Sequence, residues 1–531
     1  MRRLLPVFAL VLCLASCGRQ DRLVVPECVV STPPAELGLD PFYKKYVDVN
    51  GIPLISSWRV PDSCFVAAHR TLYAMTSMLQ PEILQAMKDH GARVAIMARY
   101  EGTTDIPEHA WTAADTTMNM DVRCRGLEGT MDCPLTTCAE ENVLCYQIDK
   151  YHAEDILVHE FAHAIQLIGI HSVDPGIDAR LQKMMDEAIA AGKWKDTYTI
   201  DNYQDYWAEG VQDWFNVNAE TPWHDGKHCW VNTREDLKKY DRPLYDLISQ
   251  YFPKTKEQIS KHPKVNLYTS EGTRPAVEPI EGIDIPECVI TTPPARLGLD
   301  PFYKKYADVN GIHLMSSHRV PDSCFVQAYN VLYAMTSFLP KDVLDAMASV
   351  DSRVGIMARY EGTTDIPEHA DLVRDTTLNW DVRARGLGGE LEFPLTTCAE
   401  ENILAYQIDK YHAEDILIHE FSHGIHLIGI VQVDPTINER LQALLDAAHA
   451  EGKYEGTYAG TCIEEYWAEG VQDWFNVNAE VPHPDGKHNW VNTREDLKAY
   501  DPGLYTLLAE YFPEVDAQIS RHKKVNLYTH E

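Results

Sequence analysis

Basic residues are scarce in this sequence. Its 531 residues contain 47 Lys and Arg against 80 Asp and Glu, so the formal net charge is −33. A chain with this charge cannot neutralise phosphates broadly, which argues against non-specific binding to nucleic acid or anionic lipid. No P-loop, G-x-S-x-G turn or dinucleotide fingerprint occurs, and no C-x-x-C pair suggests a cysteine-only zinc site. These absences exclude several common classes of enzyme and binding protein.

Long apolar runs are also missing, except at the N-terminus. Arg2 and Arg3 precede an apolar stretch over 4–14, which is too short to span a bilayer and is typical of a secretory signal. The following run, Leu-Ala-Ser-Cys-Gly, resembles the lipobox of bacterial lipoproteins. Residues 1–17 are therefore predicted to be a lipoprotein signal peptide ending in an acylated Cys17. Gly18 favours anchoring in the outer membrane of the bacterial cell envelope.

The sequence contains two tandem copies of one domain. Residues 26–271 match residues 286–531 without a gap at a constant offset of 260, and residues 272–285 between them read as an exposed linker. The period is too long for a solenoid unit, so each copy is expected to be a complete domain. Helical periodicity over 153–169, 177–191 and 205–216, with a short alternating strand over 92–98, predicts an α+β fold. The fold should be mainly helical with a small sheet.

The thirteen cysteines suggest disulfides, because an exported protein meets an oxidising compartment. Partners in a disulfide should appear and disappear together between the copies. Cys124 and Cys133 are replaced jointly in copy two, and so are Cys145 and Cys229. The predicted pairs are Cys124–Cys133, Cys145–Cys229, Cys28–Cys64 and Cys288–Cys324.

A short motif, His-Glu-x-x-His, occurs once in each copy within a helical pattern. Residues four apart lie on one face of a helix, so both imidazoles can reach one Zn²⁺. The Glu beside the first His can then take a proton from water at the metal. The predicted zinc ligands are His159 and His163 in copy one and His419 and His423 in copy two, with Glu160 and Glu420 as general bases.

A third ligand is expected on a second helix, and two assignments are open. In the first, Glu465 binds the metal, Glu469 buttresses a ligating His, and small Ala468 allows the helices to approach closely. In the second, Glu469 is the ligand and Asp473 supports it, although bulky Gln472 then occupies the position where a small residue is expected. The first assignment is favoured.

These residues resemble the gluzincin metallopeptidases, in which His-Glu-x-x-His is followed by a distal Glu. The motif is most similar to the anthrax lethal factor and Pro-Pro endopeptidase type, which carries a Tyr seven residues before the ligand Glu. Tyr458 stands seven residues before Glu465. The resemblance implies that Tyr458, and Tyr198 in copy one, stabilise the oxyanion of the tetrahedral intermediate. The motif Trp-Ala-Glu-Gly also resembles one found in gluzincin aminopeptidases. This resemblance favours the second assignment, in which Glu469 is the ligand.

Copy one departs from this pattern at the third ligand. The favoured assignment places Asp205 where copy two has Glu465, while Glu209 corresponds to Glu469. The shorter side chain would shift its oxygen by about 1.5 Å, and a shift of about 1 Å can cost about 100-fold in rate. Copy one is therefore predicted to be the weaker site under the favoured assignment. Under the second assignment, in which Glu469 and Glu209 are the ligands, both copies retain a complete set of ligands.

Two further pairs of histidines are weaker candidates. His152 and His412 lie seven residues before the first zinc ligand, and a capping or surface role is favoured. His228 and His488 could donate hydrogen bonds in the site, although a structural role is favoured.

The sequence therefore predicts a lipid-anchored zinc metallopeptidase that hydrolyses peptide or protein substrates, with one Zn²⁺ in each copy. A non-catalytic binding or adhesion lipoprotein, whose zinc is structural or lost, is the alternative. An open fourth coordination position would favour the enzyme, and a closed four-ligand site would favour the binder.

Overall fold

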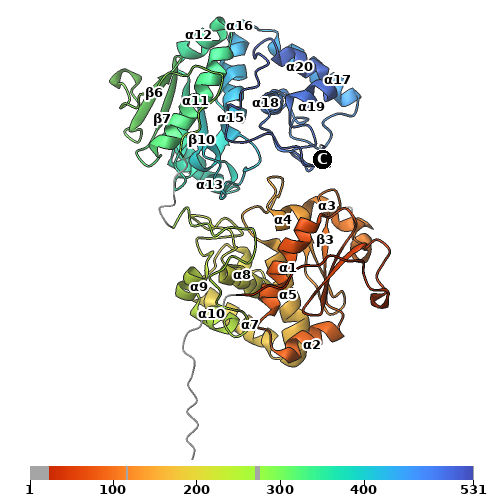
Figure 1. Cartoon of the computed structure of the whole chain (residues 1–531). Coiled ribbons are helices and arrows are strands. Elements are labelled where there is room, and N and C mark those ends of the chain that lie inside the picture. The colour runs from red at the N-terminus through yellow and green to blue at the C-terminus, as the bar shows by residue number, and fades with distance from the viewer. Residues whose placement is uncertain (1–22, 115–117, 270–275, 530–531) are drawn as a thin grey trace, which may run out of the picture.

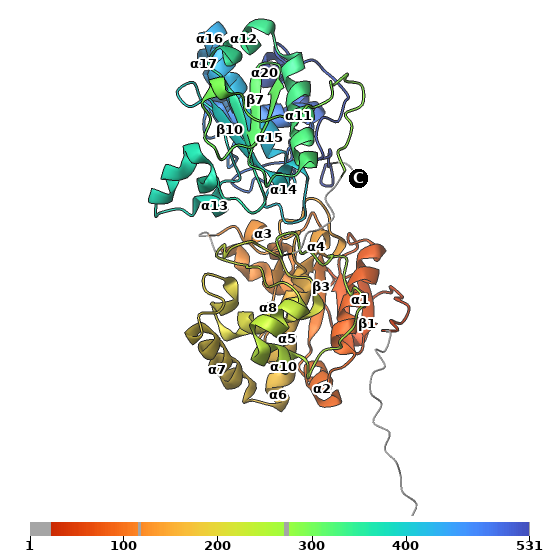
Figure 2. The same cartoon turned by 90° about the vertical axis from the view of Figure 1, so that its left-hand side faces the viewer.

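The computed structural model describes residues 23–114, 118–269 and 276–529. The predicted signal peptide and Cys17 lie outside these residues. The chain folds into two similar halves, one above the other in Figure 1 and again in the turned view of Figure 2. Each half is a mixed α+β unit with one small five-stranded sheet, as the sequence predicted.

The two sheets have the same topology. Their strand orders are β1-β2-β3-β5-β4 and β6-β7-β8-β10-β9. The three central strands of each sheet are parallel and both edge strands are antiparallel to their neighbours. The strands are β1 (Lys45–Val49), β2 (Ile52–Ser56), β3 (Arg93–Met97), β4 (Gly126–Leu127), β5 (Leu135–Ala139), β6 (Lys305–Val309), β7 (Ile312–Ser316), β8 (Arg353–Met357), β9 (Gly386–Leu387) and β10 (Leu395–Ala399).

Helices account for most of the regular structure in both halves. Those of the first half are α1 (Asp62–Thr76), α2 (Pro81–Asp89), α3 (Met120–Arg123), α4 (Glu140–Leu144), α5 (Ile156–Ala164), α6 (His171–Val173), α7 (Ile177–Ala190), α8 (Tyr203–Phe215), α9 (Arg234–Tyr240) and α10 (Arg242–Ile248). Those of the second half are α11 (Asp322–Phe338), α12 (Lys341–Ser349), α13 (Trp380–Arg383), α14 (Glu400–Ile403), α15 (Ile416–Gly424), α16 (Val431–Val433), α17 (Ile437–Ala450), α18 (Ile463–Trp474), α19 (Arg494–Tyr500) and α20 (Pro502–Leu508). Short 3₁₀ turns connect several of them.

The sheet separates a large core from a small one. In β3, Val94 and Ile96 face the main core, whereas Ala95 and Met97 face a smaller cluster on the opposite side. This alternation follows from the two-residue period of a strand. The main core contains α1 and α5, so the helix with the His-Glu-x-x-His motif is packed directly against the sheet.

The motif helices are unusually apolar because they lie inside the protein. Ile156–Val173 and Ile416–Val433 are long and apolar enough to cross a membrane, yet 72% of each is buried within its half. In both, the α-helix that carries the motif changes into one π-helical stretch, Ile165–Ile170 or Ile425–Ile430. Such stretches are frequent next to functional sites.

The predicted disulfides are not present. All eleven cysteines in the described residues are free thiols. Two cysteines that are both replaced in the second copy are dispensable there, but this does not show that they are close together in the first copy. Cys124 contacts the sulfur of Met120, whereas Cys133 packs in the small core on the far side of the sheet.

The expected linker is only partly separate from the domains. Ile280 is buried in the core of the second half, and the backbone N–H of Glu278 donates to Gln327 of α11. The second part of the connection is thus an integral piece of the second half.

The C-terminal segment of each half is bound to that half and also contacts the other half. Tyr268 of the first half meets Tyr360 of the second, and Tyr528 of the second meets Tyr100 of the first, with ring centroids 6.3 Å apart in both pairs. Arg99 Nε also donates to the backbone oxygen of Leu527 at 2.7 Å. The two halves are therefore related by an approximate two-fold arrangement in which each contacts the other's C-terminal segment.

Candidate metal centre

Each motif helix begins at a well-defined cap. Asp155 and Asp415 accept hydrogen bonds from the backbone N–H groups of Val158 and Ile418, which fixes the first turn. One turn later, the two histidines of each motif lie on the same face of the helix and are buried. The local sequence therefore fixes the direction of both imidazoles before any contact with the rest of the site.

In the second half, three donor atoms converge. His419 Nε2 and His423 Nε2 are 3.3 Å apart, and Glu465 Oε2 lies 3.2 Å and 3.6 Å from them. Tetrahedral Zn²⁺ with bonds of about 2.0–2.1 Å separates its ligand atoms by about 3.3–3.4 Å. The spacing of the three donors matches this geometry.

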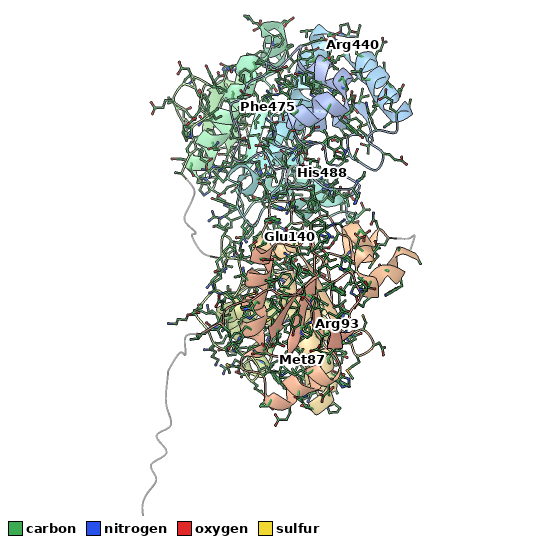
Figure 3. The ribbon with its side chains drawn as sticks, turned by 45° about the vertical axis from the view of Figure 1, so that its right-hand side comes forward. Met87, Arg93, Glu140, Arg440, Phe475 and His488 are labelled. Atoms are coloured by element: carbon green, nitrogen blue, oxygen red, sulfur yellow. The ribbon has the colours of Figure 1, made fainter. Side chains whose placement is uncertain are left out.

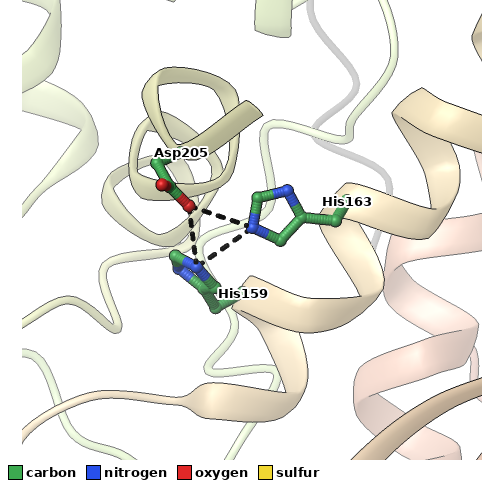
Figure 4. Close-up of side chains that lie close together, drawn as sticks. All are labelled: His159, His163 and Asp205. Carbon is green, nitrogen blue, oxygen red and sulfur yellow. Dashed lines mark hydrogen bonds and ion pairs between the residues drawn. The ribbon is translucent and has the colours of Figure 1, made fainter. Parts of the chain in front are cut away.

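The first half repeats the arrangement with Asp205 (Figure 4). His159 Nε2 and His163 Nε2 are 3.2 Å apart, and Asp205 Oδ1 lies 3.8 Å and 3.4 Å from them. Asn202, which caps α8, donates to Asp205 Oδ2 at 2.6 Å and leaves Oδ1 directed at the histidines. The shorter side chain thus still reaches the site, although one of its distances is longer than in the second half.

The second-half site has the character of a cation site. Glu465 Oε2 is buried without a hydrogen-bond partner. Burial lowers the pKa of His419, but Glu465, Glu420 and Glu469 outweigh it and raise the pKa to about 10. Burial raises the pKa of Glu465, but His419 and His423 bring it down to about 2. A divalent cation would satisfy both the orphaned oxygen and the surplus negative charge. The residues therefore fit a bound metal.

The Nδ1 side of His419 is held by a different set of residues. Nδ1 lies 2.8 Å from Gln472 Oε1, and Glu469 Oε1 is 3.6 Å away on this same side. Gln472 Nε2 faces the backbone oxygen of Asp415 at 3.1 Å, so its Oε1 is the acceptor and Nδ1 carries the proton. This tautomer leaves Nε2 free for a metal. Glu469 thus lies behind the imidazole, where it also accepts from Asn478, and not among the donor atoms at Nε2.

Gln472, and its counterpart Gln212 at 2.9 Å from His159 Nδ1, are functional candidates that the sequence analysis missed. Gln472 was considered only as a bulky residue. Its position seven residues, or about two helical turns, after Glu465 was the available signal, because it places both side chains toward the motif helix.

Packing of the two helices sets the distance between the ligands. Trp467 Nε1 donates to the backbone oxygen of Ser422 at 2.9 Å, and Trp207 makes the same bond to Ala162. Ala468 is completely buried, as expected for a small residue where two helices approach closely.

The predicted catalytic side chains border the same space. Glu420, Tyr458 and the three donor residues line a cavity of about 670 Å³ in the second half. The Tyr458 ring stacks on His419 with centroids 6.4 Å apart, and Tyr198 lies 6.1 Å from His159. Burial and nearby Glu465 raise the pKa of Tyr458 to about 12, so its phenol remains a hydrogen-bond donor at neutral pH.

The edge strand closes over the general-base position. A Cβ on Gly386 of β9 would lie 2.5 Å from Ile416 Cγ2 and 2.9 Å from Glu420 Cγ. Gly126 of β4 is equally close to Glu160 in the first half, at 3.0 Å. Glycine is required here because the strand backbone touches the motif helix.

His488 pairs with Glu414 at 3.3 Å on the wall of the cavity, and His228 pairs with Glu154 at 3.5 Å. Burial lowers the pKa of His488, but Glu414 overrides this and raises it to about 9. Figure 3 shows the labelled His488 on the side of the second half that faces the first, with Arg440 at the far end. These histidines therefore supply positive charge at the rim of each site.

Comparison with known proteins gives little beyond this geometry. A solved structure described as the Pro-Pro endopeptidase PPEP-2 from Paenibacillus alvei is similar at a TM-score of 0.26 and 18% sequence identity, over 37% of this chain and 96% of that chain. No protein-family model matches the chain, and no curated protein matches it.

Proposed function

We propose that the protein is a zinc-dependent metallopeptidase. The observation that carries this proposal is the convergence of His419 Nε2, His423 Nε2 and Glu465 Oε2 at spacings of 3.2–3.6 Å beside Glu420 in an open cavity. Three ligands that face a cavity leave the fourth position for water or substrate, which is the arrangement of catalytic zinc sites. A structural site would require a fourth protein ligand.

Each residue has a defined role in the proposed reaction. His419, His423 and Glu465 would hold Zn²⁺, which would supply the Lewis acidity needed to polarise the scissile carbonyl and acidify water. Glu420 takes the proton of the attacking water and passes it to the leaving amine. Tyr458 donates a hydrogen bond to the developing oxyanion. Glu469 and Gln472 act through His419 by fixing its orientation.

In copy one, His159, His163 and Asp205 would hold zinc, with Glu160 as base, Tyr198 as donor and Glu209 behind His159. We propose that this copy is the weaker site, because Asp205 Oδ1 lies 3.8 Å from His159 Nε2 whereas Glu465 Oε2 lies 3.2 Å from His419 Nε2. We further propose that Cys17 anchors the protein to the membrane of a bacterial cell envelope, outside the cytoplasm.

The test measures zinc content and cleavage of a mixed peptide library by the mature chain, with and without chelator. Glu420→Gln and Glu160→Gln are compared singly and together, with Glu439→Gln on the exposed face of α17 as the matched control. We expect chelation to abolish cleavage and Glu420→Gln to lower it at least about 100-fold while zinc stays bound. Absence of chelator-sensitive cleavage would contradict the proposal and favour the binding lipoprotein.

A further inference from the structure

Four lysines from both halves line one cavity between them. The cavity has a volume of about 580 Å³, and its wall includes Lys150 and Lys227 of the first half and Lys410 and Lys487 of the second. The members of each half correspond at the offset of 260, so the duplication places two equivalent pairs around the approximate two-fold axis. The same wall also carries seven carboxylates, so the partners of these carboxylates decide whether the lysines are available to a ligand.

These lysines form no close ion pairs, although Asp485 acts on Lys150, and Asp225 on Lys410, from farther away. Within residues 23–114, 118–269 and 276–529, no carboxylate oxygen lies within the 4.0 Å of an ion pair from any of the four amines. The carboxylates of the wall are engaged elsewhere. Glu141 binds Arg125, and Glu414 binds His488. The others accept hydrogen bonds from backbone N–H groups: Glu101, Asp105, Asp121, Glu480 and Asp485.

The lysines also act on each other across the boundary. Burial lowers the pKa of Lys150, and Lys227 and Lys487 lower it further, against the opposing effect of Asp485. Burial, then Lys487, Arg383 and Lys227, likewise lower the pKa of Lys410, against the opposing effect of Asp225. Like charges held near one another destabilise the protein unless an anion is bound between them. The cavity is therefore a place where an anionic ligand would be stabilised.

The cavity adjoins the candidate active site. Tyr411, Glu414, Lys487 and His488 line both it and the cavity that contains His419 and Glu420. Lys487 Nζ lies 4.9 Å from the ring centroid of Tyr411, and both residues line the two cavities. A polypeptide bound at the metal centre would thus continue along the boundary between the halves.

We propose that this inter-repeat cavity binds an acidic segment of the polypeptide substrate, through the ammonium groups of Lys150, Lys227, Lys410 and Lys487. This ligand class rests on the proposed peptidase function. The inference gives the first half a role in recognising substrates of the second, because half of the lysines belong to it. It also means that the overall negative charge does not exclude acidic substrates.

The test is a binding measurement that does not need catalysis. Full-length protein with Glu160→Gln and Glu420→Gln is titrated with a fluorescein-labelled Glu-Gly repeat peptide and with its Gln-Gly counterpart, at low and high salt. The variants are Lys150→Gln with Lys410→Gln, and Lys150→Arg with Lys410→Arg. The matched control is Lys183→Gln with Lys341→Gln, which removes the same charge from α7 and α12.

We expect Lys150→Gln with Lys410→Gln to weaken binding of the Glu peptide about tenfold, and the arginine pair to retain it. The Gln peptide should bind weakly to every variant. Equal affinity for both peptides, or equal loss in the Lys183 and Lys341 control, would overturn the inference. If cleavage occurs without lysine-dependent binding, the inference alone fails; if lysine-dependent binding occurs without any chelator-sensitive cleavage, the peptidase proposal alone fails.

Discussion

The imidazoles of His152 and His412 stack on each other, with ring centroids 3.2 Å apart and an interplanar angle of 17°. They are equivalent residues of the two copies, so the approximate two-fold axis passes between them. The capping or surface role expected from the sequence is wrong, because their ring nitrogens are buried at the boundary between the halves. Like charges at this distance would repel each other, so stacking favours the neutral form of the rings.

This pair predicts that acid weakens the structure. Burial lowers the pKa of His152 to about 3 and also lowers that of His412, which faces His152 and His522. Each pKa is lower in the folded state than the unfolded value of about 6.5, so the stability contributed by the neutral pair is fully present above pH 6.5 and is lost as the pH falls below it.

The check is urea unfolding at pH 7.5, 6.0 and 5.0 for the natural chain and for His152→Asn with His412→Asn. Because buried carboxylic acids titrate in both proteins, the difference between the two isolates the histidine pair. We expect the double variant to lose less stability on acidification. The same pH dependence in both would show that the stacked pair is not protonated on unfolding.

Exchange of the third ligand should separate the two sites. Glu465→Asp shortens the side chain of the third ligand. In the first half Asn202 holds the shorter Asp205 in place, but the second half has Cys462 at the equivalent position, so we expect cleavage to fall about 100-fold. Adding Cys462→Asn should recover part of the activity by supplying the missing amide. Zinc affinity, measured by competition with a chromophoric chelator, should follow the same order. If Glu469→Asp lowers zinc affinity more than Glu465→Asp, the ligand assignment is wrong.

The glycine under the general base should not accept a methyl group. Gly386→Ala would place Cβ 2.5 Å from Ile416 Cγ2, so the edge strand or Glu420 must move, and we expect activity to fall at least about tenfold. Gly355→Ala is the matched control, because its Cβ would meet only ordinary contacts of 3.5 Å or more and copy one has Ala95 at the equivalent position. Steady-state cleavage and thermal unfolding of both variants provide the comparison.

Gln472 should act as a positioning residue. Gln472→Ala removes the acceptor of His419 Nδ1–H, and we expect zinc affinity to fall about 10–100-fold. Gln472→Glu keeps an acceptor and should retain most of the affinity, which a purely structural role would not explain. Gln442→Ala, on the exposed face of α17, is the control. An unchanged zinc dissociation constant in Gln472→Ala would contradict the role.

Local patterns in the sequence were sufficient for much of the fold. The predicted strand over 92–98 is β3, and the helices over 177–191 and 205–216 are α7 and α8 within two residues at each end. Periodicity reports which face of an element is buried, which is why these predictions succeed. The duplication likewise predicted two similar halves.

What depends on contacts distant in sequence was not predictable. Joint loss of cysteines did not imply contact between them, and the Asn202 amide that positions Asp205 was overlooked because a cap was not considered part of the site. The stacking of His152 on His412 and the lysine-lined cavity exist only because two copies meet. A single copy of the sequence contains no signal for either.

The contact of each C-terminal segment with the other half has a consequence for assembly. One copy contains both the C-terminal segment ending near Tyr528 and the surface that contacts such a segment. Two identical copies on separate chains would therefore make the same reciprocal contacts. The connection between the copies makes this pairing intramolecular, with an effective concentration on the order of millimolar. The assembly of the inter-repeat cavity and its lysines therefore does not depend on protein concentration. Two separate chains would dissociate on dilution and lose the cavity.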